Sequence, residues 1–170
     1  MSLDGPRLMT LLLCGVACSG DPTLDDLFGG RWTVTDHQEA PECGTPAPAD
    51  PAWSAFEIAF VDLEGFLGIT VARCEGGCDT PNAAVALDVA EDRRLAGLDT
   101  ESGLFASTDG EVCQVSLIEV VAERRGDALD LGLRSFYGSL APPADGDCQR
   151  LAEDLSDDVC DVQVSMQAVR

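Results

Sequence analysis

The sequence of 170 residues predicts an all-β fold, an antiparallel meander of about eight strands. Three observations lead to this expectation. Apolar and polar residues alternate with period two over most of the chain, turn residues recur about every ten residues, and no region carries a sustained helical stripe of apolar residues. A long meander whose first and last strands pair closes into a barrel without exposed edges. A β-sandwich is the alternative arrangement.

The expected strands follow one another along the chain. The first begins within residues 28–35 and ends before a proline-rich loop over residues 37–51, because proline cannot donate to a strand ladder. A short helix is expected over residues 148–157. The other strands are expected over residues 53–62, 66–73, 83–90, 94–98, 103–107, 111–123, 128–136 and 159–169.

The longest apolar run, residues 111–123, alternates irregularly. Glu119 falls on the same side as Val115 and Leu117, although a carboxylate does not belong on a core-facing side. One extra residue in the strand would return Glu119 to the solvent side. The pattern therefore predicts a β-bulge near the middle of this strand.

The charge of the chain excludes some classes of partner. It contains 31 Asp and Glu residues against 10 basic residues, all of them arginine, and its formal net charge is −21. Such a chain repels a phosphate backbone, so no nucleic-acid partner is expected. A hydrophobic content of 45% is too high for a disordered acidic tail, and residues 28–170 have the length of a single domain with its own core.

The N-terminal residues have the character of an export signal. Residues 8–17 are apolar and uncharged and follow Arg7. This stretch is shorter than the roughly 20 residues that a membrane-spanning helix needs, but it has the length of the apolar region of a signal peptide. Residues 1–17 are therefore predicted to be a signal peptide, ending in small residues just before Cys18.

The residues around Cys18 resemble the lipobox of bacterial lipoproteins, usually Leu, two small residues and Cys. Val16 and Ala17 match that pattern, whereas Gly15 stands where leucine is usual. The resemblance implies cleavage before Cys18, a diacylglyceryl group on its sulfur and an acylated amine, which together give stable membrane anchoring. Residues 18–27 would then be the lipidated N-terminus and a tether.

The resemblance also bears on localisation. In such lipoproteins an aspartate directly after the lipidated cysteine retains the protein at the inner membrane. This chain has Ser19 there, so the resemblance implies an outer-membrane lipoprotein of the cell envelope. The alternative is an ordinary signal peptide cut after Ala17, which gives a soluble secreted or periplasmic protein.

Of the eight cysteines, Cys14 would be removed with the signal peptide and Cys18 would be lipidated, so six would remain. An even number in an exported domain predicts three disulfides. We expect a Cys148–Cys160 bond, which would pin the intervening helix to the barrel. The pairing of the other four stays open: two glycines permit a Cys74–Cys78 bridge, and the alternative ties one of these cysteines to the loop of Cys43. The six candidates are Cys43, Cys74, Cys78, Cys113, Cys148 and Cys160.

Residues 28–32, Phe-Gly-Gly-Arg-Trp, resemble the Gly-x-Trp signature that opens the first strand of lipocalin-like barrels. Gly30 and Trp32 are the matching positions. The resemblance implies a lipocalin-like β-barrel whose base is closed by Trp32, with a short helical turn before it. It also implies an arginine at the end of a late strand that packs on Trp32, and Arg134 is the candidate.

The sequence gives no catalytic residue, metal site or cofactor. His37 is the one histidine, and we expect it to be exposed in a loop without a nucleophile motif. Cys74 and Cys78 lack the second close pair that zinc needs. Asp145 and Asp147 do not match a calcium loop.

Two functions fit these features. The first is a non-catalytic structural or protein-interaction role in the cell envelope, anchored to the membrane by lipid. The alternative is lipocalin-like binding of a small apolar ligand inside the barrel. We favour the first because only 5% of the residues are aromatic, and Val, Ala and Leu fill a narrow barrel well. The expected interior residues are Phe56, Ile58, Phe60, Leu67, Ile69, Val71, Val85, Leu87 and Leu131.

Overall fold

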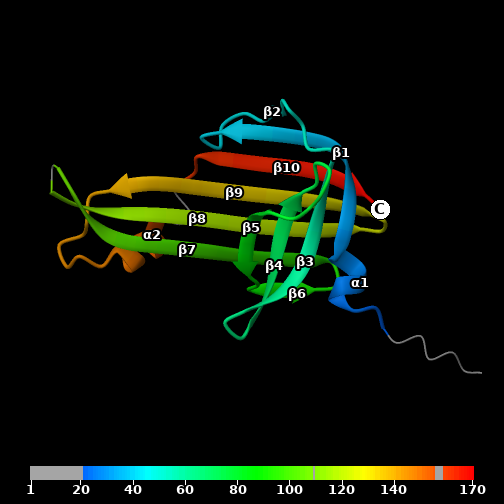
Figure 1. Cartoon of the computed structure of the whole chain (residues 1–170), viewed down its shortest axis with the longest axis horizontal. Helices are drawn as coiled ribbons and strands as arrows, with labels where there is room; N and C mark the ends of the chain where they lie inside the picture. Colours follow the sequence, from blue (N-terminus) through cyan, green and yellow to red (C-terminus); the bar gives the residue numbers. More distant parts are fainter. Residues whose placement is uncertain (1–20, 109, 156–158) are drawn as a thin grey trace, which may run out of the picture.

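The computed structural model describes residues 21–108, 110–155 and 159–170 (Figure 1). The signal peptide and Cys18 lie outside these ranges. The first half contains α1 (Leu24–Phe28), β1 (Gly30–Pro41), β2 (Ala47–Pro48), β3 (Ala55–Leu63), β4 (Phe66–Arg73) and β5 (Pro81–Ala86). The second half contains β6 (Val89–Glu91), β7 (Arg94–Ser107), β8 (Gly110–Arg125), β9 (Ala128–Leu140), α2 (Cys148–Leu155) and β10 (Val162–Val169). Neither of these helices is long and apolar enough to cross a bilayer.

The predicted fold class is confirmed: the chain is an antiparallel meander that curls into a lipocalin-like half-barrel. The strand order is β5-β4-β3-β1-β10-β9-β8-β7-β6, and β2 pairs with β1. The first and last long strands pair with each other, as expected, with Thr33 opposite Val169. The barrel stays open between β5 and β7, which touch without forming a ladder. At the point of contact, a Cβ on Gly97 would collide with the carbonyl oxygen of Ala86.

The core fills the interior between the two halves of the curled sheet. Thr23 caps α1, and its hydroxyl and backbone exchange hydrogen bonds with Asp26 in a capping box. The helix presents Leu27 and Phe28 to the core. Trp32 follows in β1, fully buried, and its Nε1–H donates to the carbonyl oxygen of Phe28 at 2.8 Å.

Most of the expected interior residues belong to this core. Phe60 and Leu87 are partly buried against it, whereas Leu67 is exposed near the β3–β4 turn, where the barrel wall has ended. The six that are almost fully buried are Phe56, Ile58, Ile69, Val71, Val85 and Leu131.

Several expected boundaries are wrong. β1 continues to Pro41 because its end pairs with β10 and β2, so the proline-rich loop begins later. Residues 94–98 and 103–107 belong to one strand, β7, which pairs with β8 along its whole length. Residues 83–90 instead divide between β5 and β6, on opposite edges of the sheet.

The predicted β-bulge in β8 is also wrong. The register with β7 and β9 is unbroken from Cys113 to Glu123. Instead, the strand buries opposite faces at its two ends: Cys113 and Val115 face α2, whereas Val120 and Ala122 face the barrel core. The irregular alternation therefore reflects two cores on opposite sides of one regular strand.

Beyond the barrel, β7, β8 and β9 project together as an arm, on the left in Figure 1. We define the arm as residues 98–107, 110–118 and 135–140, and call the rest of the sheet the body. At its near end, β6 pairs with β7 only at residues 94–96, and β10 pairs with β9 only as far as Ser135. The arm is thus a three-stranded ribbon without further partner strands in the described chain.

We predict that Trp32→Ala lowers the free energy of unfolding by about 3–5 kcal/mol, the range for truncating a large buried aromatic residue. Phe66→Ala is the matched control: Phe66 is 68% exposed at the β3–β4 turn, so its truncation should change stability by less than about 0.5 kcal/mol. Urea unfolding monitored by circular dichroism measures both. Equal losses for the two variants would contradict the position of Trp32.

Candidate functional site

The Gly-x-Trp region at the base of the barrel is tied to the end of the chain. The Arg170 guanidinium carbon lies 4.6 Å from the centroid of the Trp32 ring. Arg170 also donates to the carbonyl oxygens of Asp26, at 2.7 Å, and of Gly29. A cation over an aromatic ring and charged hydrogen bonds both stabilise such a junction. This constellation holds α1, β1 and β10 together and serves the fold.

Arg134, the expected partner of Trp32, is the wrong arginine. It lies in β9 opposite Glu119 of β8, and its Nε donates to the Glu119 carboxylate at 2.8 Å. The final strand pairs with β1 and so delivers Arg170, not Arg134, to Trp32.

The six cysteines lie in three disulfide pairs. Cys43 pairs with Cys160, Cys74 with Cys78, and Cys113 with Cys148, with Cα–Cα distances of 5.8, 4.4 and 5.4 Å. The Cys74–Cys78 bridge is the one that the two glycines permit. These pairs fasten loops and α2 to the sheet.

The expected Cys148–Cys160 bond is wrong because its two cysteines serve different parts of the fold. Cys160 precedes β10, which pairs with the end of β1, and Cys43 follows that end. Cys148 begins α2, which packs on the arm where Cys113 lies. Strand pairing between distant segments therefore overrides closeness in sequence.

Two groups of possible ligands are already occupied. The ligand atoms of Glu57, Cys74 and Cys78 lie within 4.8 Å of one another, but the two sulfurs are joined to each other and offer no thiolate to zinc. Asp145 forms an ion pair with Arg150 at 2.6 Å. The hydrogen bond from the Asp147 backbone N–H and the nearby Arg150 lower the pKa of Asp145.

His37 is buried in β1, at 5% exposure, so its expected exposure in a loop is wrong. Its Nδ1 accepts a hydrogen bond from the backbone N–H of Trp53 at 2.9 Å. Among the described residues its Nε2 has no hydrogen-bond partner, and the Glu39 carboxylate lies 3.5 Å away. The side chain thus anchors the segment around Trp53 to β1. It makes no described hydrogen bond to a serine or cysteine nucleophile.

The arm has one covered face. α2 packs against it through Ala152 and the Cys113–Cys148 disulfide, with Val115 beneath. The Gln149 side chain adds hydrogen bonds with the hydroxyls of Thr100 and Ser102, at 3.3 and 3.0 Å. A small second core therefore holds α2 on this face of the arm.

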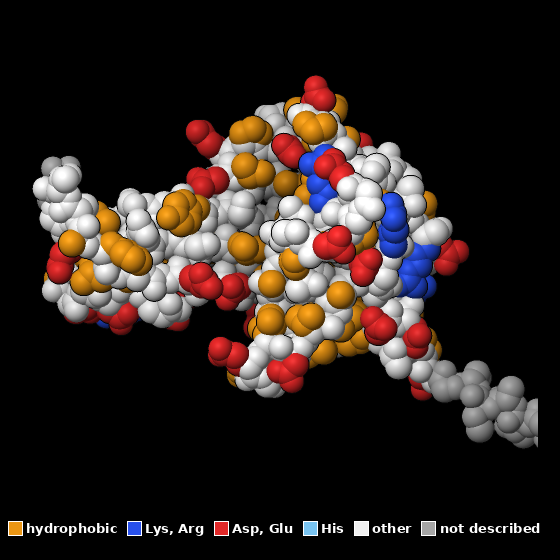
Figure 2. All heavy atoms as spheres, in the orientation of Figure 1, with side chains coloured by type: hydrophobic (Ala, Val, Ile, Leu, Met, Phe, Trp, Pro, Cys, Tyr) orange, Lys and Arg blue, Asp and Glu red, His pale blue; other side chains and the backbone are white. Residues whose placement is uncertain are grey.

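The other face of the arm is open. It is the continuation of the barrel's inner face, since Phe105 and Tyr137 share the side of core residues in β7 and β9. Phe105 is 50% exposed and Tyr137 is 68% exposed, and both line a depression of about 200 Å³ with Glu101 and Gln114. Figure 2 shows hydrophobic and acidic side chains on the arm, whereas most of the arginine side chains visible in this view lie on the body.

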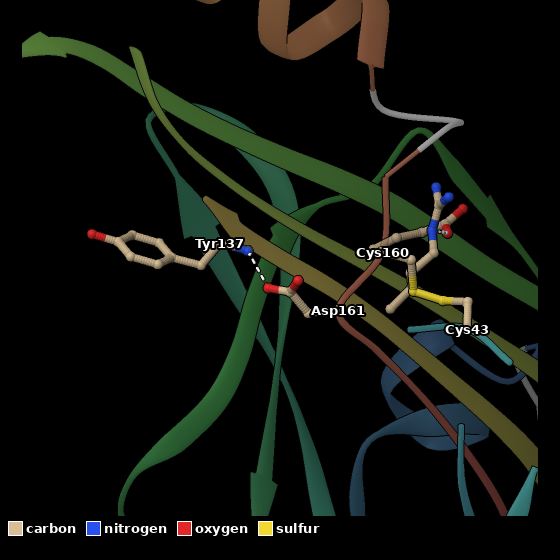
Figure 3. Close-up of a disulfide and its surroundings, with 6 residues drawn as sticks. Cys43, Tyr137, Cys160 and Asp161 are labelled. Carbon is tan, nitrogen blue, oxygen red and sulfur yellow. Dashed lines mark hydrogen bonds and ion pairs between the residues drawn. A yellow bond between two sulfur atoms is a disulfide. The ribbon is translucent and has the colours of Figure 1, made fainter. Parts of the chain in front are cut away.

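The β9 edge of the arm is blocked at its start. The Asp161 carboxylate accepts a hydrogen bond from the backbone N–H of Tyr137 at 2.8 Å (Figure 3). Asp161 follows Cys160, whose bond to Cys43 fixes this segment against β1. A charged side chain on an edge amide is one way in which proteins stop a further strand from adding.

No described strand covers the β7 edge of the arm, although α2 packs against β7 on one face. From residue 98 to 106 no described strand pairs with its outer side, and Gln149 of α2 bonds to side chains on its face. In an antiparallel pair, alternate residues direct their backbone groups away from the partner. The edge therefore presents a row of backbone donors and acceptors.

No protein-family model matches the chain, and no curated protein or solved structure shows significant similarity to it. The open arm is not predicted from the sequence, because the pattern of residues 94–107 predicts two short strands in place of β7. The signal that could have found it is the reversal of the buried face within residues 111–123.

We predict that His37 makes stability depend on pH. Burial is the main cause that lowers the pKa of His37, and Arg73 adds to it, while Glu39 and Asp36 oppose it. The unfolded state then binds the proton more readily, so stability falls as pH drops below about 6.5 toward the lowered pKa.

His37→Asn is the comparison, because the amide oxygen of Asn can still accept from Trp53 N–H. The difference in unfolding free energy between the two proteins should stay constant above about pH 7.5 and shift against the native protein between about pH 6.5 and 5. The carboxylates titrate in both proteins and largely cancel. The prediction is contradicted if the difference in unfolding free energy between the two proteins is the same at about pH 7.5 and at about pH 5.

Proposed function

We propose that this protein is an exported, lipid-anchored protein of the cell envelope with a non-catalytic role in protein interaction. The observation that carries the interaction role is the arm, which exposes Phe105, Tyr137 and a strand edge outside a packed barrel. Exposed apolar groups at a sheet edge are costly to keep in a soluble domain unless they are used.

The interior favours this role over the alternative of an apolar ligand held in the barrel. Large side chains from both halves of the sheet meet in one contiguous core, with Trp32, Phe56 and Leu95 fully buried. A depression of about 390 Å³ lies instead on the outer face of β1, β8, β9 and β10, where its lining includes Asp36, Glu123 and Asp130. Its acidic lining does not suit an apolar ligand.

The disulfides support export. All six cysteines of the described chain are paired, and such bonds persist in oxidising compartments. Because these six cysteines pair with one another, none of them needs Cys18 as a disulfide partner. That count agrees with lipidation of Cys18, which would place the domain at a membrane surface through the tether of residues 18–27.

Cys18→Ala tests the anchor. In a bacterial host that processes lipoproteins, we expect the unaltered protein in the membrane fraction and the variant in the soluble periplasmic fraction, since the acyl chains supply the membrane affinity. Fractionation and immunoblotting measure the distribution, and mass spectrometry of the N-terminal peptide measures the lipid.

Cys14→Ala is the matched control. Cys14 lies within the signal peptide, so its replacement should leave the mature protein lipidated and membrane-bound. Membrane association that persists unchanged in the Cys18→Ala variant contradicts the lipid anchor.

A further inference from the structure

We propose that the free edge of β7, residues 98–106, receives an extended, cationic segment of a partner protein as an added strand. The proposal rests on the proposed function and deepens it, because it names the surface that binds and the chemistry of the partner. Addition of a strand to a sheet edge is a general mode of peptide recognition: main-chain hydrogen bonds give affinity, and side chains give specificity.

No described strand occupies the outer backbone of β7 over residues 98–106. β6 occupies the outer side of β7 only at residues 94–96, and β8 holds the inner side as far as Ser107. β8 fixes β7 in an extended conformation, so little conformational entropy is lost there when a peptide binds. At the opposite edge, Asp161 already occupies the Tyr137 amide, so a strand could add only beyond it, along residues 138–140, a shorter length than β7 offers.

The side chains near the end of β7 in the arm are apolar and would pack against apolar side chains of a partner. Leu104 and Phe105 point to opposite faces, and they are 44% and 50% exposed. The Phe105 ring lies across Gly103, where a Cβ would come within 2.7 Å of it. A strand laid alongside β7 would place its own alternating side chains against Leu104 on one face and Phe105 on the other.

Charge selects the partner. Asp99 and Glu101 are exposed on the same side of β7 as Phe105, and residues 98–107, 110–118 and 135–140 contain no lysine or arginine. A second copy of this chain would bring another formal charge of −21, whereas lysine or arginine opposite Glu101 gains from the acidic field. The matching segment therefore carries basic residues at one end and apolar residues at the other.

The test uses the disulfide-intact mature protein and a short fluorescent peptide that alternates lysine and threonine and ends in valines. We expect saturable binding by anisotropy and slower hydrogen exchange in residues 98–106. Asp99→Lys/Glu101→Lys should weaken binding by about tenfold or more, because it reverses the charge of the edge. Asp92→Lys/Asp127→Lys makes the same charge change at turns on the other end of these strands and should leave the affinity unchanged.

Two peptide controls separate strand addition from simple charge attraction. Replacing lysine by glutamate should abolish binding, and N-methylation of alternate peptide amides should do so as well. The proposal is overturned if the native protein does not bind the peptide, if both double variants lose affinity equally, or if the N-methylated peptide binds as well as its parent. It is also overturned if the protein sediments as a dimer with the β7 amides already protected.

These outcomes are independent of the lipid anchor. A membrane-bound protein that fails to bind the peptide removes the edge proposal and leaves the envelope assignment standing. A protein that binds the peptide but carries no lipid removes the lipid anchor and leaves the edge proposal standing.

Discussion

Strand β8 must bury opposite faces at its two ends, and the rest of the structure depends on this constraint. Val120 and Ala122 need the barrel core, whereas Cys113 and Val115 need a cover on the other side. One regular strand can satisfy both only if it runs past the barrel into a region with a second cover. α2 supplies that cover, and the Cys113–Cys148 disulfide holds it in place. The arm, its open inner face and its free edge all follow from this division.

Much of the fold is predictable from alternation because most strands have one buried face. The all-β meander, the pairing of the first and last strands, and the short helix that begins at Cys148 agree with the structure. Alternation fails where the buried face changes. Glu119 is irregular only if one core is assumed, since it lies where neither core covers that face and pairs with Arg134. The alternation of apolar and polar residues along one strand does not show how many separate cores bury its faces.

The residues of the candidate site are less predictable because their neighbours come from distant segments. Cys160 meets Cys43 through the β1–β10 ladder, across 117 residues. That ladder also brings Arg170 to Trp32, and sequence resemblance alone could give the kind of residue but not its position. His37 is buried because residues near Trp53 fold over it. The free edge of β7 exists because no described strand pairs with it, and no sequence motif predicts that a strand will lack a neighbour.

Native-state hydrogen exchange tests the two-core account most directly, because exchange rates report the local stability of each end of β8. We expect amides of residues 110–118 in the disulfide-intact protein to be protected strongly, like those of residues 119–125. Cys113→Ser/Cys148→Ser should release α2 and accelerate exchange in residues 110–118 while residues 119–125 stay protected. Exchange in residues 110–118 of the intact protein at the rate of an unfolded chain would contradict the account.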